Sequence, residues 1–266
     1  MTTPAILQGY APPSSLKLPK AFNFLNPIGQ LADTTNLAGL YMFGGDDEAC
    51  LFNFANPDLP LTKIGSPTVT AAGGVSGDWQ NGYETGIHET AAMTVLAVIK
   101  PYTATNGSSL LNNGAFDHNG VGPVSPVGVT MKLGPTALNL QPQSGVSVDL
   151  IPALGGGSMS TSDYGIAVFR LDATNADISW TRNGTRTDSS TGATGSRPTQ
   201  DYRTLRIMAN FGVGSGVNGG YDTIPNLLML AIWAGTKLSD GNRNTTITNL
   251  RSWFNAGGSG LGITTL

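Results

Sequence analysis

The sequence predicts an all-β protein, and three observations support this fold class. Glycine accounts for 36 of the 266 residues and charged residues for only 12%, a composition typical of short strands joined by tight turns. Short apolar runs recur along the chain and end at Gly, Pro, Asn or Asp. Residues 164–187 show the pattern of a buried strand followed by a hairpin. We therefore expect one large domain built as a sandwich of two sheets.

Residues 1–36 differ in composition from the chain that follows. Five prolines interrupt any helix or central strand, yet the segment is too apolar for a solvated tail. We expect an extended arm that packs against its own domain, a sister subunit or another protein. The simpler alternative is an N-terminal strand that wraps the sandwich of the same chain.

The first half of the predicted domain contains three clear strands. Residues 37–43 form the first, residues 68–72 the second, and residues 91–99 a third that is expected to be buried on both faces and ends before Pro101. Residues 78–89 are polar and aromatic, so we expect a loop or a short irregular strand there.

Residues 127–133 and 137–141 are predicted strands on either side of a turn at Gly134-Pro135. Residues 155–158 are three glycines and a serine. Too few strands lie on either side to complete two separate sandwiches, so this stretch is predicted to be a long loop and not an interdomain linker.

The central hairpin is the most specific local signal. Residues 166–171 are almost all apolar, as expected of a strand covered on both faces. Ile178, Trp180 and Arg182 then alternate with polar residues, which turns one set of side chains inward. Asn183-Gly184 follows, and this pair favours a type I′ turn because both residue types tolerate positive φ.

Two further strands are predicted at residues 205–209 and 227–234. The glycine-rich residues 212–220 lie between them. A dinucleotide-binding fingerprint would need a helix that starts inside the glycine run, and no helix is predicted there, so we expect a flexible loop.

One helix is predicted near the C-terminus. Ser239 or Asp240 can cap its first turn, and Gly257-Gly258 ends it. Its apolar side chains recur every three or four residues and should lie against the sandwich: Ile247, Leu250, Trp253 and Phe254. The polar side chains expected to face water are those of Asn242, Arg243, Asn249 and Arg251.

Charge and cysteine content exclude several classes of function. The net charge is -3 and the 14 Lys and Arg residues are scattered, so no nucleic-acid partner is expected. Cys50 is the only cysteine and its apolar neighbours favour a buried position. No secretory signal is expected at the N-terminus, and no apolar run approaches the roughly 20 residues that would insert into a membrane.

Candidate metal ligands and nucleophiles are sparse. The histidines are His88, near Glu84 and Glu89, and His118, between Asp117 and Asn119. Polar loops routinely contain such groups, and no spacing requires a metal. Calcium bound through Asp46 and Asp47 stays open, because hard cations take clustered oxygen ligands. No Gly-x-Ser-x-Gly elbow occurs. We therefore predict no catalytic residue, no metal site and no cofactor.

The order of elements resembles the concanavalin A-like, laminin-G-like jelly rolls found in bacteriophage tail and other virion proteins. The resemblance covers about residues 37–256. It rests on these stretches: LAGLYMF, AAMTVLAVIKP, YGIAVFRLD with ISWTRNG, LRIMANFG, and LLMLAIWAGTKLSD with the helix after it.

This resemblance implies an antiparallel jelly-roll sandwich at residues 37–266, which follows the arm at residues 1–36 and has a short C-terminal helix. Such domains commonly bind glycans and sometimes hydrolyse them. Hydrolytic members carry a Glu-x-Asp-x-Glu pattern, which holds carboxylates in one cleft. The chain has no such triplet, so we expect that it is not an enzyme.

Glycan binding needs aromatic faces that stack on sugar rings and polar groups that bond to hydroxyls. The predicted ligand-binding residues are Trp79, Asn81, Tyr83, Trp180, Arg182 and Tyr202. The competing interpretation is that Trp180, at an inward-facing strand position, belongs to the core.

We therefore expect a tail-associated virion protein, assembled in the host cytoplasm, with a lectin-like module for attachment to host-surface glycan. Its expected partners are other virion proteins, contacted through the arm, and further copies of itself, with a trimer as one option. The alternatives are a decoration or baseplate protein that makes only protein contacts, and a glycan-degrading enzyme.

Overall fold

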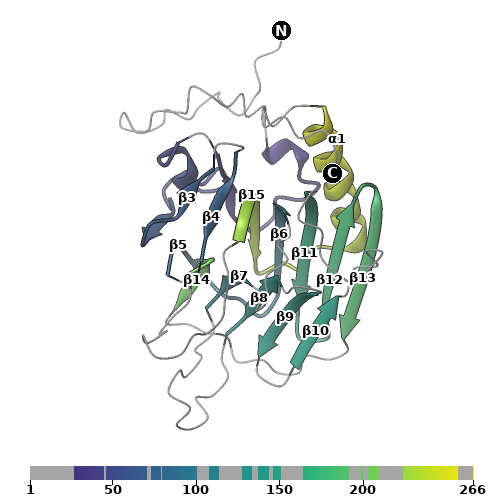
Figure 1. Cartoon of the computed structure of the whole chain (residues 1–266). Helices are drawn as coiled ribbons and strands as arrows, with labels where there is room; N and C mark the ends of the chain where they lie inside the picture. The colour runs from purple at the N-terminus through teal and green to yellow at the C-terminus, as the bar shows by residue number, and fades with distance from the viewer. Residues whose placement is uncertain are drawn as a thin grey trace.

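The computed structural model of the chain shows two packed β-sheets and a C-terminal α-helix (Figure 1). The residues that it describes are 27–44, 46–70, 73–78, 80–100, 108–113, 128–133, 137–143, 146–150, 164–191, 199, 203–209, 224–256 and 266. The predicted fold class, an all-β sandwich with a short C-terminal helix, is confirmed.

The first layer, sheet A, contains eight strands: β1 (Leu37–Met42), β3 (Thr68–Val69), β4 (Val75–Gly77), β6 (Met93–Lys100), β11 (Gly165–Leu171), β12 (Ala176–Arg182), β13 (Thr185–Thr191) and β15 (Ile224–Ala234). Their order is β13-β12-β11-β6-β15-β4-β3, and β1 also pairs with β15.

The second layer, sheet B, contains seven strands: β2 (Thr62–Ile64), β5 (Gly82–His88), β7 (Ser108–Asn112), β8 (Thr130–Leu133), β9 (Leu138–Gln143), β10 (Val146–Leu150) and β14 (Thr204–Ile207). Their order is β10-β9-β8-β7-β14-β5-β2. Every described strand pair in both sheets is antiparallel.

Each strand predicted from the sequence corresponds to a strand of the structure, and the predicted and observed bounds differ by a few residues. The sequence missed four strands, β2, β4, β7 and β10, which are three to five residues long. It also treated residues 78–89 as a loop or irregular strand, whereas β5 is a seven-residue strand of sheet B that pairs with β14 on one side and β2 on the other. The predicted loops at residues 155–158 and 212–220 lie outside the described residues.

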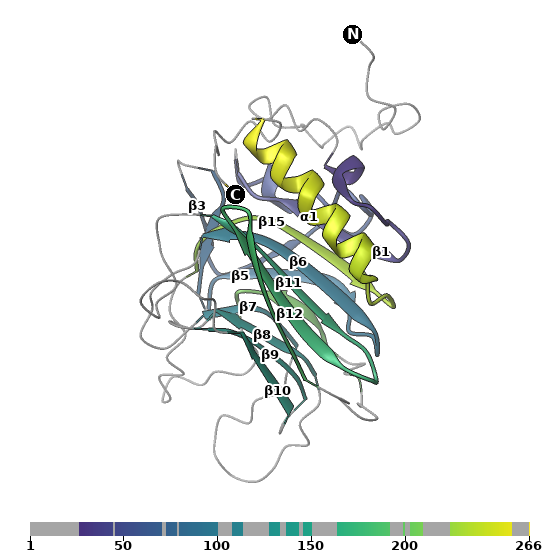
Figure 2. The same cartoon turned by 90° about the vertical axis from the view of Figure 1, so that its right-hand side faces the viewer.

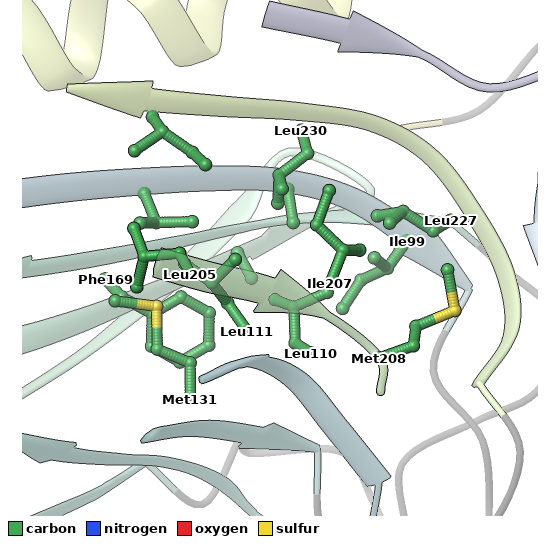
Figure 3. Close-up of a cluster of buried hydrophobic side chains, with 14 of the residues drawn as sticks. Ile99, Leu110, Leu111, Met131, Phe169, Leu205, Ile207, Met208, Leu227 and Leu230 are labelled. Carbon is green, nitrogen blue, oxygen red and sulfur yellow. The ribbon is translucent and has the colours of Figure 1, made fainter. Parts of the chain in front are cut away.

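The main core fills the space between the two sheets. On β11 the side chains of Ala167, Phe169 and Leu171 face sheet B, as the period of two requires. Figure 3 shows Phe169 close to Met131 from β8 and Leu111 from β7, with side chains of β14 beside them. These residues are fully buried, which makes the sandwich interior the largest apolar contribution to stability.

A second apolar cluster lies between sheet A and helix α1 (Asp240–Asn255), which crosses the outer face of that sheet (Figure 2). The alternate side chains of β11, Ile166 and Val168, face this helix and meet Leu250 and Phe254. The strand is therefore covered on both faces, as its apolar run predicts. Ser239 caps α1, because its Oγ accepts a hydrogen bond from the Asn242 amide at 3.1 Å.

Ion pairs fix the first turn of α1 to sheet A. The buried Arg170 guanidinium lies 2.7 Å from both the Asp177 and the Asp240 carboxylates, and it donates to the Leu238 carbonyl at 2.7 Å. The prediction that Arg243 faces water was wrong. Its side chain is buried and donates to the Ser179 hydroxyl at 2.8 Å, because the helix turns it onto the charged edge of the sheet.

The segment at residues 27–36 packs on the domain, although sequence analysis placed it in the arm. A short 3-10 turn, η2 (Ile28–Gln30), leads to Leu31, which is buried against α1. The Ala32 amide donates to the Thr246 hydroxyl at 3.0 Å, and the Trp233 indole donates to the Asp33 carbonyl at 2.9 Å. Residues 1–26 lie outside the described part of the chain.

Within the described residues, no helix combines the length and apolar composition needed to cross a lipid bilayer.

Candidate functional site

The six residues predicted to bind a glycan have different environments. Trp79 and Tyr202 lie outside the described residues. Asn81 is partly exposed, and its side chain organises a loop by accepting a hydrogen bond from the Ser66 amide at 2.7 Å. Arg182 is partly exposed at the end of β12. Three strands of sheet A separate β12 from β4, which precedes Asn81, so these two residues do not form one site.

Tyr83 and Trp180 belong to the core, and their assignment to a binding surface is corrected here. Tyr83 is fully buried beside Phe43, with ring centroids 5.7 Å apart, and burial raises the pKa of its phenol. Trp180 is 2% exposed and lies over Gly165, where a Cβ atom would come within 2.4 Å of the indole. No sugar can reach either ring in this fold.

The solvent-facing side of β5 presents a different group of polar residues. Tyr83, Thr85 and Ile87 point into the core, so Glu84 and His88 point outward. The Arg206 guanidinium on β14 lies 2.7 Å from the Glu84 carboxylate.

The Thr204 hydroxyl donates to the second oxygen of the Glu84 carboxylate. Both Glu84 oxygens are therefore held in place, while about a quarter of each side chain in the Glu84–Arg206 pair stays exposed.

A bulge in β5 completes this arrangement. Glu84 is directly opposite Arg206 and His88 is opposite Thr204, so three residues of β5 lie between these pairs where β14 has one. Gly86 lies inside the bulge with a φ of 69°, in the left-handed region that favours glycine. The bulge therefore places His88 next to Thr204, whose hydroxyl contacts Glu84.

The outward residues of neighbouring strands continue this polar surface. Thr62 on β2 lies directly opposite Glu84, on the same side of the sheet. We call Thr62, Glu84, His88, Thr204 and Arg206 the Glu84 face. It offers carboxylate and hydroxyl acceptors beside guanidinium donors, the functional groups that bind the hydroxyls of a glycan.

On the other side of β14 the polar row becomes buried. Asn112 on β7 lies opposite Arg206 and is 1% exposed, and its amide donates to the Ala209 carbonyl at 2.9 Å. Thr130 on β8 follows in the row and is also buried. The accessible part of the row is therefore the Glu84 face.

Glu89, the second carboxylate considered from the sequence, has a structural position. It follows β5, is 5% exposed, and accepts a hydrogen bond from the Asn113 amide at 2.8 Å. This bond ties the end of β5 to the end of β7. Glu89 therefore lacks the exposure that Glu84 has.

The acidic residues considered for calcium serve the loop after β1. Asp46 accepts a hydrogen bond from the Ala49 amide at 2.8 Å, and Asp47 forms an ion pair with Lys63 at 2.5 Å. No group of three or more His, Cys, Asp or Glu side chains is arranged to hold a metal ion in the described residues. Asp117, His118 and Asn119 lie outside those residues.

Comparison with solved structures shows that this sandwich occurs in proteins that act on carbohydrates. Domain 4 of AbnA, a GH43 extracellular arabinanase from Geobacillus stearothermophilus solved with arabinotriose, superposes with a TM-score of 0.50 at 14% identity and covers 79% of this chain and 98% of that domain. A Trypanosoma rangeli sialidase variant with trans-sialidase activity superposes with a TM-score of 0.53 at 10% identity. This chain is covered over 86% of its length, but it spans only 37% of that sialidase.

Tailspike protein 2 of the Escherichia coli O157:H7 bacteriophage CAB120 gives a lower TM-score of 0.47 at 14% identity, over 68% of this chain and 26% of the tailspike. No protein-family model and no protein of curated function matches the sequence. At these identities the likeness shows the fold alone. It supports the sandwich that the sequence resemblance implied and identifies no single jelly-roll family.

The expectation that the protein is not an enzyme is contradicted, because the sandwich is shared with a domain of a GH43 arabinanase and with Trypanosoma rangeli sialidase, which are enzymes. The argument from the missing Glu-x-Asp-x-Glu triplet was too narrow. That triplet describes one way to bring carboxylates together, whereas β5 and β14 build a polar surface from residues about 120 positions apart.

Proposed function

We propose that the protein binds a bacterial surface polysaccharide through the Glu84 face and serves a glycan-degrading phage tail assembly. The observation that carries the proposal is the Glu84 carboxylate, fixed by Arg206 and Thr204 on an accessible face of sheet B. A carboxylate that is already oriented loses little further freedom when it accepts hydrogen bonds from sugar hydroxyls.

Two further observations support this proposal. The arabinanase domain that shares the fold over nearly its whole length was solved with a bound arabinose oligomer. The placement in a phage tail rests on the sequence resemblance to jelly rolls of virion proteins.

Binding of purified capsular polysaccharides and lipopolysaccharide O-chains by the full chain, measured by affinity electrophoresis and calorimetry, tests the proposal. Glu84→Gln should weaken binding about tenfold or more, because a hydrogen bond to a charged group contributes about 1.5–3 kcal/mol. The matched control is Glu48→Gln, which makes the same chemical change at an exposed position that is not part of the Glu84 face.

Polysaccharide length, measured in the same samples by size-exclusion chromatography, reports cleavage. Shortening that Glu84→Gln abolishes would give Glu84 a catalytic role. The proposal fails if the unmodified chain binds none of these polysaccharides, or if Glu84→Gln and Glu48→Gln bind equally well.

A further inference from the structure

A polar pocket of about 340 Å³ lies on the side of the sandwich opposite to the Glu84 face. It forms where the edge of sheet A meets the first turn of α1. Arg170, Asp177 and Ser190 lie directly opposite one another on β11, β12 and β13 and make its floor. Asp240 and Arg243 from α1 line its other side. Its volume falls within the range of small-molecule sites, about 300–1,000 Å³.

The charges around this pocket are mixed and largely paired. Arg170 is neutralised by two carboxylates at 2.7 Å. Arg243 lies 3.2 Å from Asp240, 3.7 Å from Asp177 and 3.8 Å from Asp188. Burial and the neighbouring Arg170 lower the pKa of Arg243. An anionic ligand would meet three carboxylates, and a cationic ligand would meet two guanidinium groups, so neither sign of charge is favoured.

The hydrogen-bonding capacity that stays open in this pocket consists mainly of acceptors. The Asp240 and Asp188 side chains are 74% and 40% exposed, so their carboxylates can accept further bonds. A ligand that satisfies these acceptors must carry several donors without a net charge, and sugar hydroxyls meet both requirements.

We infer that this pocket is a second carbohydrate site, which holds one neutral sugar unit. The inference rests on the proposed function for the class of ligand, but it uses different residues on the other sheet. Two sites on one rigid sandwich would raise the avidity for a branched or densely packed polysaccharide, because the second contact becomes intramolecular.

Nuclear magnetic resonance titration of the full chain tests the inference. The neutral probes are D-galactose, D-glucose and N-acetyl-D-glucosamine, and the charged probes are D-galacturonate and D-glucosamine. We expect at least one neutral sugar to bind with a Kd in the millimolar range, equivalent to about 4 kcal/mol. The charged analogues should bind less tightly.

Ser190→Trp should weaken that binding at least tenfold, because the indole would fill the pocket that Ser190 lines. The variant should still fold, since Ser190 is exposed on the edge strand and its replacement removes no ion pair. The matched control is Thr185→Trp, at another exposed position of β13 outside the pocket, which should bind as the unmodified chain does. Equal unfolding temperatures of the two variants would show that both are folded.

The inference is overturned if no neutral sugar binds, if a charged analogue binds more tightly, or if Ser190→Trp binds unchanged. Glu84→Gln separates the two proposals. Loss of polysaccharide binding in Glu84→Gln, with no effect of Ser190→Trp on any probe, would refute the second site alone. If Ser190→Trp loses sugar binding while Glu84→Gln binds polysaccharide normally, the Glu84 face is refuted as a binding site and the pocket is supported.

Discussion

Single residues show how strongly burial changes the role of a side chain in this protein. Arg243 and Trp180 have chemistries suited to a binding surface, yet both are buried. Trp180 fills the space that Gly165 leaves open, and Arg243 supplies positive charge beside Asp177 and Asp188. The sequence alone could not show that Arg243 is buried, because its polar helical position is typical of an exposed one.

Asp172 illustrates a charge whose pKa the fold shifts. Burial raises its pKa, but hydrogen bonds from Thr174 and the Asn175 amide, together with nearby Lys237, lower it to about 2. A carboxyl with a lower pKa in the folded than in the unfolded state stabilises the fold above its unfolded pKa of 3.8. This contribution is lost as the pH falls from 3.8 to about 2.

Asp172→Asn should therefore lower the free energy of unfolding at pH 7 by at most about 2 kcal/mol, since one pKa unit corresponds to about 1.4 kcal/mol. Urea denaturation at pH 7, 4 and 2.5 measures the effect, and the gap between variant and unmodified chain should narrow as the pH falls. Asp58→Asn, at an exposed position, is the control and should change little. A gap that stays constant with pH would contradict the assigned role of Asp172.

Secondary-structure elements follow local sequence where turn and cap chemistry are strong. The hairpin between β12 and β13 has the predicted turn, with a φ of 47° at Asn183 and 80° at Gly184. The cap of α1 at Ser239 is also as predicted. By contrast, β5 was hard to recognise because the polar residue Thr85 occupies one of its core-facing positions and Gly86 lies within it, so its pairing with β14 and β2 is what defines it as a strand.

Gly184→Ala should destabilise the protein by about 1–2 kcal/mol, the usual cost of a left-handed conformation for a residue with a Cβ atom. The new Cβ would also lie 3.0 Å from the Arg251 guanidinium, which must shift. Asn183→Gly is the control, since glycine adopts positive φ without strain. Thermal unfolding of both variants tests this, and equal unfolding temperatures would show that the turn does not require positive φ.

At the scale of the whole molecule, the boundary between arm and domain determines how the protein can be divided. Residues 27–36 contribute Leu31 to the cluster under α1, and Asp33 accepts hydrogen bonds from Trp233 and Asn242. These contacts belong to the domain and are separate from any assembly role of the arm. We propose that the arm, which precedes this boundary, holds the chain to other copies of itself or to virion proteins.

Two truncated chains test this division. Removal of residues 1–36 should lower the unfolding temperature more than removal of residues 1–26, because only the longer deletion removes Leu31 and Asp33. Analytical ultracentrifugation of the same chains reports assembly. Dissociation of an oligomer after the shorter deletion would support the proposal for the arm. If the number of chains per particle stays the same, the arm does not hold copies of the chain together. Equal unfolding temperatures would contradict the contacts described for residues 27–36.

Local sequence patterns were enough to predict the all-β class, the hairpin closed at Asn183-Gly184 and the C-terminal helix. These features depend on periodicity, turn residues and caps, which act over a few neighbouring residues. The contacts between polar groups that lie far apart in the sequence could be identified only from the folded chain. Glu84 and Arg206 are 122 positions apart and pair because β5 and β14 align in one register. Arg170 and Asp240 are 70 positions apart and meet because α1 packs across sheet A. A local pattern cannot encode such pairings, since the register between distant strands is set by the packing of the whole sandwich.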